Sequence, residues 1–260
     1  MCNCCRKCII LIVFSYICRG QVISGSRIKR IVGGVKVPHD QHVPYIVSIE
    51  FFGQQVLGGS IIGPSTILTV AHWLEEIKAW QLTVRAGTKD ICSKTGMIVK
   101  VQATHCHPFY DKENDNNDIG LVRLAQALEY NDDIQPIKIF GGVVKTDEKA
   151  FVAGWGVEYS GGHSVCCLNM LEVRIIDQQV CSYVWPHLTD GMICAGHSVD
   201  GKDTCIGDSG GPLVVNGLLV GITSHGPLPC GDKSYPGIYT RITKFIPWLE
   251  WTLNEYYYGL

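Results

Sequence analysis

The sequence predicts an antiparallel all-β protein, a barrel or a sandwich, and three observations support this prediction. Short apolar or alternating stretches recur along residues 31–242, with Gly, Pro, Asn and Asp between them, as is typical of strands joined by turns. Helical spacing of apolar residues is confined to the C-terminal end. Hydrophobic residues make up 46% of the 260 residues and charged ones 18%, which permits a buried core and excludes a disordered chain.

The expected strands follow one another at short intervals. In chain order they cover 45–52, 60–62, 67–70, 81–86, 97–101, 119–124, 150–153, 171–176, 212–215, 218–223 and 237–242. The triplet Lys94-Thr95-Gly96 suits a hairpin turn between two of them. A C-terminal amphipathic helix is expected over 242–253, where apolar residues recur at helical spacing: Ile242, Phe245, Ile246, Leu249 and Leu253.

The first twenty residues have the pattern of a secretory signal peptide. Arg6 and Lys7 precede an apolar run over 8–18, and small or polar residues follow it. The run is shorter than the roughly twenty residues that a membrane-spanning helix needs. We therefore expect cleavage near Gly20 and a secreted, extracellular protein; the alternative is an uncleaved signal anchor.

Charge is unevenly distributed along the chain. Residues 1–30 contain six Lys or Arg and no acidic residue, which leaves 16 of the 22 basic residues against all 24 acidic ones in the remainder. A body with this acidic excess lacks the dense basic face that nucleic-acid binding requires, so we expect no nucleic-acid partner.

Cysteine usage also indicates an extracellular protein. Of the 13 cysteines, five lie within 1–18, and an even number, eight, remains for a processed chain. The eight are Cys92, Cys106, Cys166, Cys167, Cys181, Cys194, Cys205 and Cys230. No Cys-x-x-Cys pair occurs among them, which disfavours a zinc site.

Three short segments together supply the residue types of nucleophilic catalysis. They are Thr69-Val70-Ala71-His72, Asn117-Asp118-Ile119-Gly120-Leu121 and Gly207-Asp208-Ser209-Gly210-Gly211-Pro212. Taken singly, His72 could be a structural histidine, Asp118 a turn residue and the glycine-rich segment a loop. Taken together, they provide a nucleophilic hydroxyl, a base to activate it and a carboxylate to orient that base. The N–H groups of Gly207 and Ser209 are the candidate donors to an oxyanion.

With these segments in place, the chain resembles the chymotrypsin-like serine peptidases, and specifically their trypsin-type members. The matching motifs are Ile31-Val32-Gly33-Gly34, Gly58-Gly59-Ser60, Ala71-His72, Asp118-Ile119, Gly154-Trp155-Gly156, the segment 207–212 and Pro236-Gly237-Ile238-Tyr239. They occur in the family's order of His, Asp and Ser. The resemblance implies one peptidase domain over 31–260: two six-stranded antiparallel β-barrels, roughly 31–135 and 136–240, followed by a C-terminal helix. The catalytic cleft would lie between the barrels, with His72 and Asp118 from the first and Ser209 from the second.

The resemblance also implies synthesis as a zymogen. Residues 21–30 would form an activation peptide that an activating protease cleaves after Arg30. The freed amino group of Ile31 would then pair with Asp208 and order the oxyanion loop, since a buried charge is costly without a partner. The alternative is that Lys29 and Arg30 are only a charged linker.

Specificity is implied by position relative to the serine. Asp203 matches the base of the primary pocket in trypsin-type members, and Gly226 and Gly237 match its walls. Ser224 and the two residues after it would present backbone groups to an extended substrate. The implied substrates are proteins or peptides cleaved after Arg or Lys. One alternative is that Asp203 is an exposed loop residue. Another is chymotrypsin-like or elastase-like specificity.

Beyond these substrates, the implied partners are an activating protease and protein inhibitors. We expect a monomer without cofactor or metal; in particular, no acidic pair at and after Thr88 matches the family's calcium loop. His105-Cys106-His107 is metal-like in isolation, but a strand with alternating faces explains it more simply.

Two of the family's disulfides are missing as whole pairs. Leu57 and Trp73 occupy one pair of positions, where we expect them to face each other as an apolar replacement, and Ala150 and Val215 occupy the other. The resemblance implies that Cys181–Cys194 and Cys205–Cys230 are retained. Cys92 and Cys106 flank the expected hairpin and are the candidates for a third bridge, while the adjacent Cys166 and Cys167 have no assigned partner.

His225 stands where the family usually has a tryptophan, so we expect an altered preference for upstream substrate residues. Together with the bridge missing beside His72, it favours a rival hypothesis, a non-catalytic homologue with a binding or regulatory role. The complete triad, the activation site and Asp203 favour the enzyme.

Overall fold

The computed structural model describes residues 31–260 except 94, 158–161, 163 and 259–260. The expected signal peptide (1–20), the activation peptide (21–30) with Arg30, and Lys94 of the expected turn lie outside the described residues. Within the described part, no helix combines the length and apolar character needed to cross a membrane.

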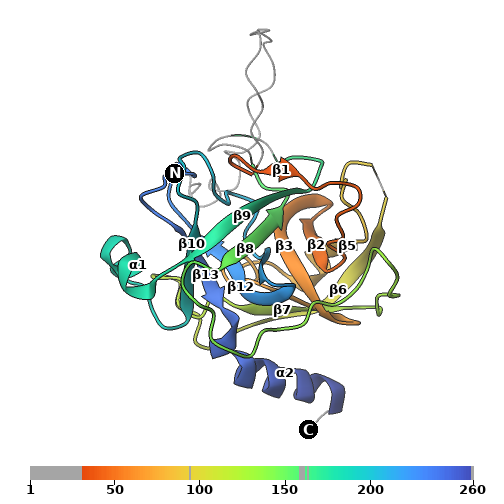
Figure 1. Cartoon of the computed structure of the whole chain (residues 1–260). Helices are drawn as coiled ribbons and strands as arrows, with labels where there is room; N and C mark the ends of the chain where they lie inside the picture. The colour runs from red at the N-terminus through yellow and green to blue at the C-terminus, as the bar shows by residue number, and fades with distance from the viewer. Residues whose placement is uncertain (1–30, 94, 158–161, 163, 259–260) are drawn as a thin grey trace, which may run out of the picture.

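The first half of the chain forms a closed six-stranded antiparallel barrel (Figure 1). Its strands are joined in the order β2-β3-β4-β7-β6-β5. They are β2 (Ile46–Phe51), β3 (Gln54–Gly63), β4 (Thr66–Thr69), β5 (Leu82–Ala86), β6 (Met97–Cys106) and β7 (Gly120–Leu124). A short 3-10 turn, η1 (Ala79–Gln81), leads into β5.

The second half forms another six-stranded barrel, in the order β9-β10-β13-β12-β11-β8, which a β8–β9 pairing closes. Its strands are β8 (Lys149–Gly154), β9 (Asn169–Ile176), β10 (Met192–Gly196), β11 (Pro212–Val215), β12 (Leu218–His225) and β13 (Gly237–Arg241). A two-residue strand near the start of the described chain, β1 (Val35–Lys36), pairs with β9. The expected fold class, two six-stranded antiparallel barrels with a C-terminal helix, is confirmed.

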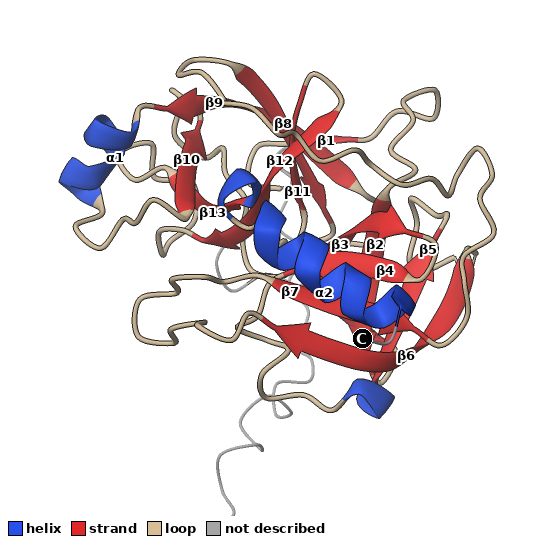
Figure 2. Ribbon diagram, turned by 90° about the horizontal axis from the view of Figure 1, so that it is seen from below, coloured by secondary structure: helices blue, strands red, loops and turns tan. Residues whose placement is uncertain are grey.

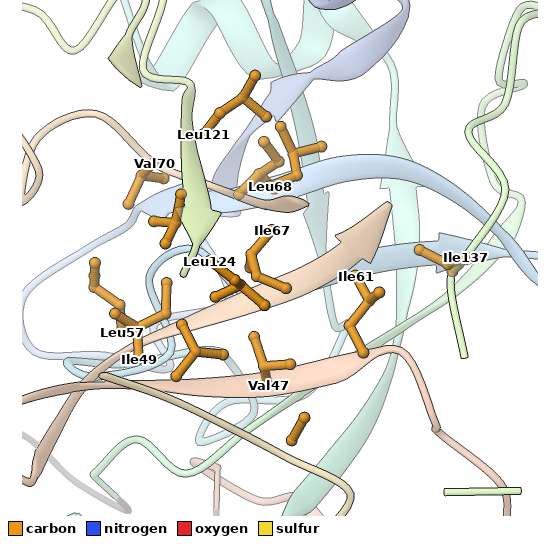
Figure 3. Packing of buried hydrophobic residues seen from close by; sticks show 14 of the residues in the cluster. Val47, Ile49, Leu57, Ile61, Ile67, Leu68, Val70, Leu121, Leu124 and Ile137 are labelled. Atoms are coloured by element: carbon orange, nitrogen blue, oxygen red, sulfur yellow. The ribbon is translucent and has the colours of Figure 1, made fainter. Parts of the chain in front are cut away.

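Each barrel encloses its own apolar core. Figure 3 shows part of the first core, in which Val47, Leu57, Ile61, Ile67 and Leu121 are almost completely buried. The second core is built from the inward residues of β8 to β13 and also contains Ile31. Burial of one such aliphatic side chain stabilises the fold by about 1.5–3 kcal/mol.

Two α-helices of the described chain lie outside the barrels. The C-terminal helix α2 (Ile246–Tyr258) follows a 3-10 turn, η2 (Ile242–Lys244), and packs across the first barrel through Leu249, Trp248 and Leu253 (Figure 2). The sequence does not predict the seven-residue helix α1 (Gln178–Val184), whose N-terminus is capped by the Asp177 carboxylate. Seven residues are too few for apolar periodicity to be recognised.

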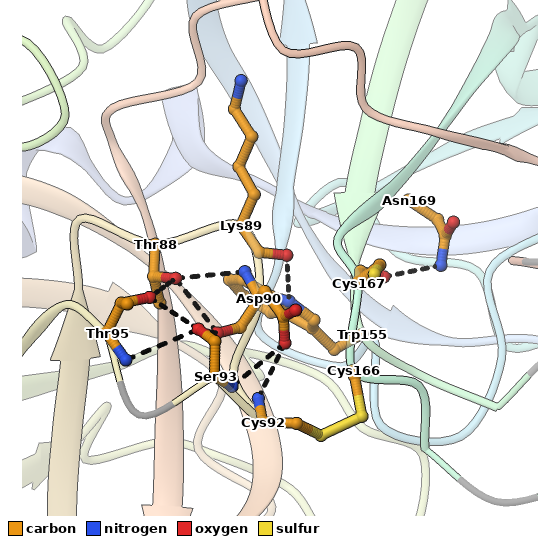
Figure 4. Close-up of a disulfide and its surroundings, with 10 residues drawn as sticks. All are labelled: Thr88, Lys89, Asp90, Cys92, Ser93, Thr95, Trp155, Cys166, Cys167 and Asn169. Carbon is orange, nitrogen blue, oxygen red and sulfur yellow. Dashed lines mark hydrogen bonds between the residues drawn. A yellow bond between two sulfur atoms is a disulfide. The ribbon is translucent and has the colours of Figure 1, made fainter.

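Three disulfides lie among the described residues. The two implied by the resemblance, Cys181–Cys194 and Cys205–Cys230, are present. The third joins Cys92, in the connection between β5 and β6, to Cys166, just before β9 (Figure 4), so it links the two barrels covalently.

The expected Cys92–Cys106 pairing is therefore wrong. Cys92 lies on an exposed loop held by the Asp90 carboxylate, which accepts its backbone N–H, and this loop faces the second barrel. Cys106 ends β6 on the far side of the hairpin, with its sulfur 3.8 Å from the carbonyl oxygen of Ala71. Cys106 and Cys167 are the free cysteines of the described chain.

Apolar packing replaces only part of the two missing disulfides. Ala150 and Val215 both lie in the second core, and Leu57 lies in the first. Trp73, in contrast, is 39% exposed. At the first pair of positions Leu57 is buried in the barrel interior while Trp73 stays partly exposed, and a contact between them stays a prediction.

Candidate active site

The three catalytic candidates lie at strand ends where the two barrels meet. His72 follows β4 and Asp118 precedes β7, so both belong to the first barrel, while Ser209 precedes β11 of the second. The junction is tight, because the backbone N–H of Gly58 on β3 donates to the carbonyl oxygen of Ser209 at 2.8 Å. A methyl group at Gly210 would overlap Thr69 and the Gly58 carbonyl, and its φ of +81° also favours glycine.

His72 and Asp118 form a hydrogen-bonded pair. Nδ1 of His72 lies 2.8 Å from Oδ2 of Asp118, and the carboxylate is 1% exposed. Its Oδ1 accepts the backbone N–H groups of Ala71 and His72, at 2.8 and 2.9 Å, and its Oδ2 accepts the Ser224 hydroxyl at 2.6 Å. The pair therefore holds the imidazole with Nε2 available, and the second barrel helps to hold it.

Opposing effects set the protonation of this pair. Burial lowers the pKa of His72, but the hydrogen bond and charge of Asp118, with the charge of Asp115, outweigh it and raise the pKa above its ordinary value. Burial raises the pKa of Asp118, yet the bonds from His72 and Ser224 and the charge of His72 bring it below the ordinary value. The result is an ionised carboxylate beside an imidazole of increased basicity.

The Ser209 hydroxyl and two backbone N–H groups lie at the proposed nucleophile. The Ser209 hydroxyl donates to the carbonyl oxygen of Ser224 at 3.4 Å, and Ser224 in turn bonds Asp118. Within the described chain, no hydrogen bond uses the backbone N–H of Gly207 or Ser209. Both groups remain candidate donors to an oxyanion.

Gln55, which belongs to none of the sequence motifs, contacts the same loop from β3. Its Nε2 donates to the carbonyl oxygen of Gly207 at 2.8 Å, and this fixes the orientation of the peptide next to the candidate oxyanion donors. The two residues are 152 positions apart, and no local pattern in the sequence marks Gln55.

Asp203 lies beside a cavity that reaches Ser209. The cavity holds about 180 Å³ and is lined by Thr204, Cys205, Ile206, Ser209, Thr223, Ser224, His225, Gly226, Pro227, Leu228 and Cys230. The Asp203 carboxylate is buried and accepts the backbone N–H groups of Thr204 and Gly231. A methyl group at Gly237 or Gly226 would lie 3.2 or 3.8 Å from it, so two glycines leave the space above this carboxylate open.

Burial raises the pKa of Asp203 to about 7, and the charge of Asp208 adds to this shift. The bonds from the backbone N–H groups of Thr204 and Gly231 oppose it. A cation bound above Asp203 favours its ionised form, so binding of the cation and loss of the proton are coupled.

Asp208 is fully enclosed. Its carboxylate oxygens accept the backbone N–H groups of Gly156 and Cys205, at 2.9 and 3.0 Å. A methyl group at Gly154 or Gly156 would overlap the carboxylate, so glycine is required at both positions. Burial raises the pKa of Asp208 to about 6, and none of the ion pairs among the described residues includes it.

The start of the described chain lies against the same loop. Ile31 is completely buried, and Val32 packs with Val157 and Cys205. The Val32 carbonyl oxygen accepts the backbone N–H of Asp203 at 3.0 Å. The segment at Ile31 thus reaches the region of Asp203 and Asp208.

Potential metal ligands do not form an intact cluster in the described part of the chain. The one group of three, Asp90, Cys92 and Cys166, has both sulfurs in the interbarrel disulfide. In the His105-Cys106-His107 stretch, His107 packs its ring against Phe245 and Trp248, which is an aromatic contact with the C-terminal segment.

Comparisons with known proteins agree with this architecture. Residues 31–249 match the protein family described as Trypsin. The chain is 36% identical to chicken (Gallus gallus) trypsin II-P29 over 246 residues, which covers 92% of the chain and 96% of that protein. It is 37% identical to human kallikrein-8 over 236 residues, covering 87% of the chain and 88% of the relative.

A solved structure is similar as well. It is neuropsin, described as a serine protease expressed in the limbic system of mouse brain. The two structures superpose with a TM-score of 0.78 at 34% identity, over 85% of this chain and 98% of neuropsin.

Proposed function

Because the chain belongs to the trypsin family and is a serine endopeptidase, we propose that it cleaves its protein substrates after Arg or Lys, with Ser209, His72 and Asp118 as its triad. One observation is the main support for cleavage after Arg or Lys. A buried carboxylate, Asp203, lies under two glycine walls beside a cavity that opens at Ser209.

The hydrogen-bonded pair of His72 and Asp118, with Ser209 at the same junction of the barrels, supports acyl transfer. Ser209 Oγ attacks the substrate carbonyl carbon while His72 Nε2 takes the hydroxyl proton, and Asp118 stabilises the imidazolium. The Gly207 and Ser209 N–H groups bind the oxyanion, and each such donor lowers the barrier by roughly 3–4 kcal/mol. The C–N bond breaks as His72 passes the proton to the leaving amine. Water then hydrolyses the acyl-enzyme with His72 acting as base again.

A cationic side chain completes the primary pocket. Its ammonium or guanidinium group reaches Asp203 through the space left by Gly226 and Gly237, and it favours ionisation of a carboxylate whose pKa burial raises to about 7. The Cys205–Cys230 bridge joins two residues that line this cavity and so braces it.

The buried carboxylate of Asp208 supports the proposal that cleavage after Arg30 activates the enzyme. This buried carboxylate lacks a cationic partner among the described residues, and the segment at Ile31 and Val32 lies beside its loop. A new α-amino group at Ile31 supplies the missing charge. We further propose that the protein is secreted as a zymogen through its N-terminal signal sequence. The three disulfides fit an oxidising compartment.

The rival proposal is a non-catalytic homologue, favoured by His225 and by exposed Trp73 in place of a bridging cysteine. The test is to cleave the purified precursor at Arg30, label it with a fluorophosphonate and profile it on a peptide library. We expect labelling at Ser209, cleavage after Arg or Lys, and neither in Ser209→Ala or in uncleaved Arg30→Gln. Absence of label in the cleaved protein would establish the rival, and an Arg30→Gln precursor as active as the processed enzyme would refute the zymogen.

A further inference from the structure

A histidine and a carboxylate face each other beside the proposed triad. His225, the last residue of β12, has Nδ1 3.6 Å from Oδ2 of Asp115 and 3.2 Å from the Ser224 hydroxyl. The other oxygen of Asp115, Oδ1, accepts the Tyr110 hydroxyl at 2.9 Å. Both side chains remain partly accessible, 28% for His225 and 34% for Asp115.

The loop that presents Asp115 is held in place by its own side chains. The Asp111 carboxylate accepts the backbone N–H of Glu113 and the side-chain amide of Asn114, at 2.9 and 2.8 Å. The side-chain oxygen of Asn116 accepts the Thr189 hydroxyl at 2.7 Å, which ties the loop to the second barrel. Asp115 itself has a φ of +54°, so the loop fixes it in the left-handed region. The carboxylate is therefore preorganised at the cleft.

His225 does not neutralise this carboxylate at neutral pH. Burial lowers the pKa of His225, and the charge of His72 lowers it further. These two effects outweigh the charges of Asp115 and Asp118, which raise it. The remaining neighbour, Trp185, meets the imidazole edge-on at 5.9 Å and carries no charge. A neutral imidazole beside Asp115 leaves one negative charge at the rim.

An extended substrate brings its penultimate side chain to this rim. In the proposed complex the substrate strand runs along 224–226, and the side chain before the cleaved bond enters the cavity beside Asp203. Successive side chains of a strand point in opposite directions, so the preceding one points away from that cavity. It then faces the first-barrel wall, where Asp115 lies close enough to influence the pKa of His72.

We propose that Asp115 and His225 form a subsite that selects a cationic side chain, Lys or Arg, at the residue immediately before the cleaved Arg or Lys. This inference rests on the proposed function and deepens it, because it makes paired basic residues the preferred cleavage sequence. Asp115 supplies the charge, and the neutral His225 ring has a nitrogen that accepts a hydrogen bond, which an indole lacks.

The test uses the processed enzyme and matched peptides that all carry Arg before the cleaved bond and differ only in the residue preceding it, Lys, Arg, Ala, Leu or Glu. We expect kcat/KM to be about fivefold to tenfold higher for Lys and Arg than for Ala, and lowest for Glu. Equal cleavage of all five peptides overturns the inference but leaves the proposed function intact. If processed enzyme cleaves none of them, although a separate sample of the same preparation labels with a fluorophosphonate, both proposals are overturned.

Variants assign the preference to these two residues. Asp115→Asn keeps an acceptor for Tyr110 and removes the charge, so it is expected to erase the difference in kcat/KM between the Lys and Ala peptides. Asp132→Asn, which removes an exposed carboxylate from the connection between β7 and β8, is the matched control and is expected to keep the ratio. A ratio that survives Asp115→Asn overturns the proposal.

Acidification supplies a second readout. Protonation of His72 reduces turnover of both peptides equally, so the Lys/Ala ratio reports on the subsite alone. We expect the ratio to fall as the pH drops and His225 becomes charged, and to be independent of pH in His225→Gln. A ratio that falls identically in His225→Gln excludes His225 from the subsite.

Discussion

Replacement of Asp118 by asparagine is the sharpest test of the proposed triad, because the hydrogen bonds dictate how the new amide must sit. The Oδ1 position accepts two backbone N–H groups, from Ala71 and His72, so the amide oxygen must occupy it. The NH2 group then lies at the Oδ2 position, where it faces Nδ1 of His72. Since NH2 can only donate, Nδ1 must accept, and the imidazole proton moves to Nε2. In that tautomer Nε2 cannot take the proton of Ser209.

The expected loss in kcat for Asp118→Asn is roughly 10⁴-fold, the value given by the Ser-His-Asp template of this family, or about 5.5 kcal/mol of barrier. The assay is hydrolysis of an Arg peptide amide by the processed enzyme, with Ser209→Ala as the floor and Asp132→Asn as the control. The melting temperature should change little, because the amide keeps the two backbone bonds at the Oδ1 position and its NH2 group donates to Ser224 Oγ in place of the bond that Oδ2 accepted. A kcat within tenfold of the parent, in a folded variant, would refute the assignment of Asp118.

Three further outcomes are expected. The raised pKa of His72 means that kcat/KM rises with pH through a value above about 6.5, because only the neutral imidazole is active; a midpoint below 6 in a pH profile contradicts this. Asp203→Ser is expected to lower kcat/KM for Arg peptides at least about 10³-fold, measured against a Phe peptide; unchanged Arg cleavage contradicts it. Replacing Cys92 and Cys166 together by alanine opens a 74-residue loop and is expected to cost roughly 4 kcal/mol in chemical denaturation; an unchanged midpoint contradicts it.

The strands that were predicted are those with local evidence. Alternation and flanking turn residues located β2, β5, β7 and β11 to within about two residues. The prediction missed β10, because its five residues, Met192–Gly196, are all buried and show no alternation. It also missed the first half of β3, where Gly58 and Gly59 weaken the strand pattern although the structure packs them closely against Gly211 and Ile67.

The site could be predicted as far as its motifs extend. The segments around His72, Asp118 and Ser209 are recognisable because the proposed chemistry needs those residues in a fixed local context. Three contacts could not be predicted from motifs. They are the bond from Gln55 to Gly207, the pair of Asp115 and His225, and the Cys92–Cys166 bridge. Each acts across the junction between the barrels, and such contacts depend on tertiary structure that no short stretch of sequence encodes.

Each terminal segment of the described domain packs on the barrel that is farther from it in sequence. β1 adds to the sheet of the second barrel, although it precedes the first, and α2 lies on the first barrel, although it follows the second. Each barrel is therefore held by a terminal segment that is continuous in sequence with the other barrel. A single backbone cut in the connection at 125–148 should consequently leave two interlocked fragments that hold the cleft together without a continuous chain.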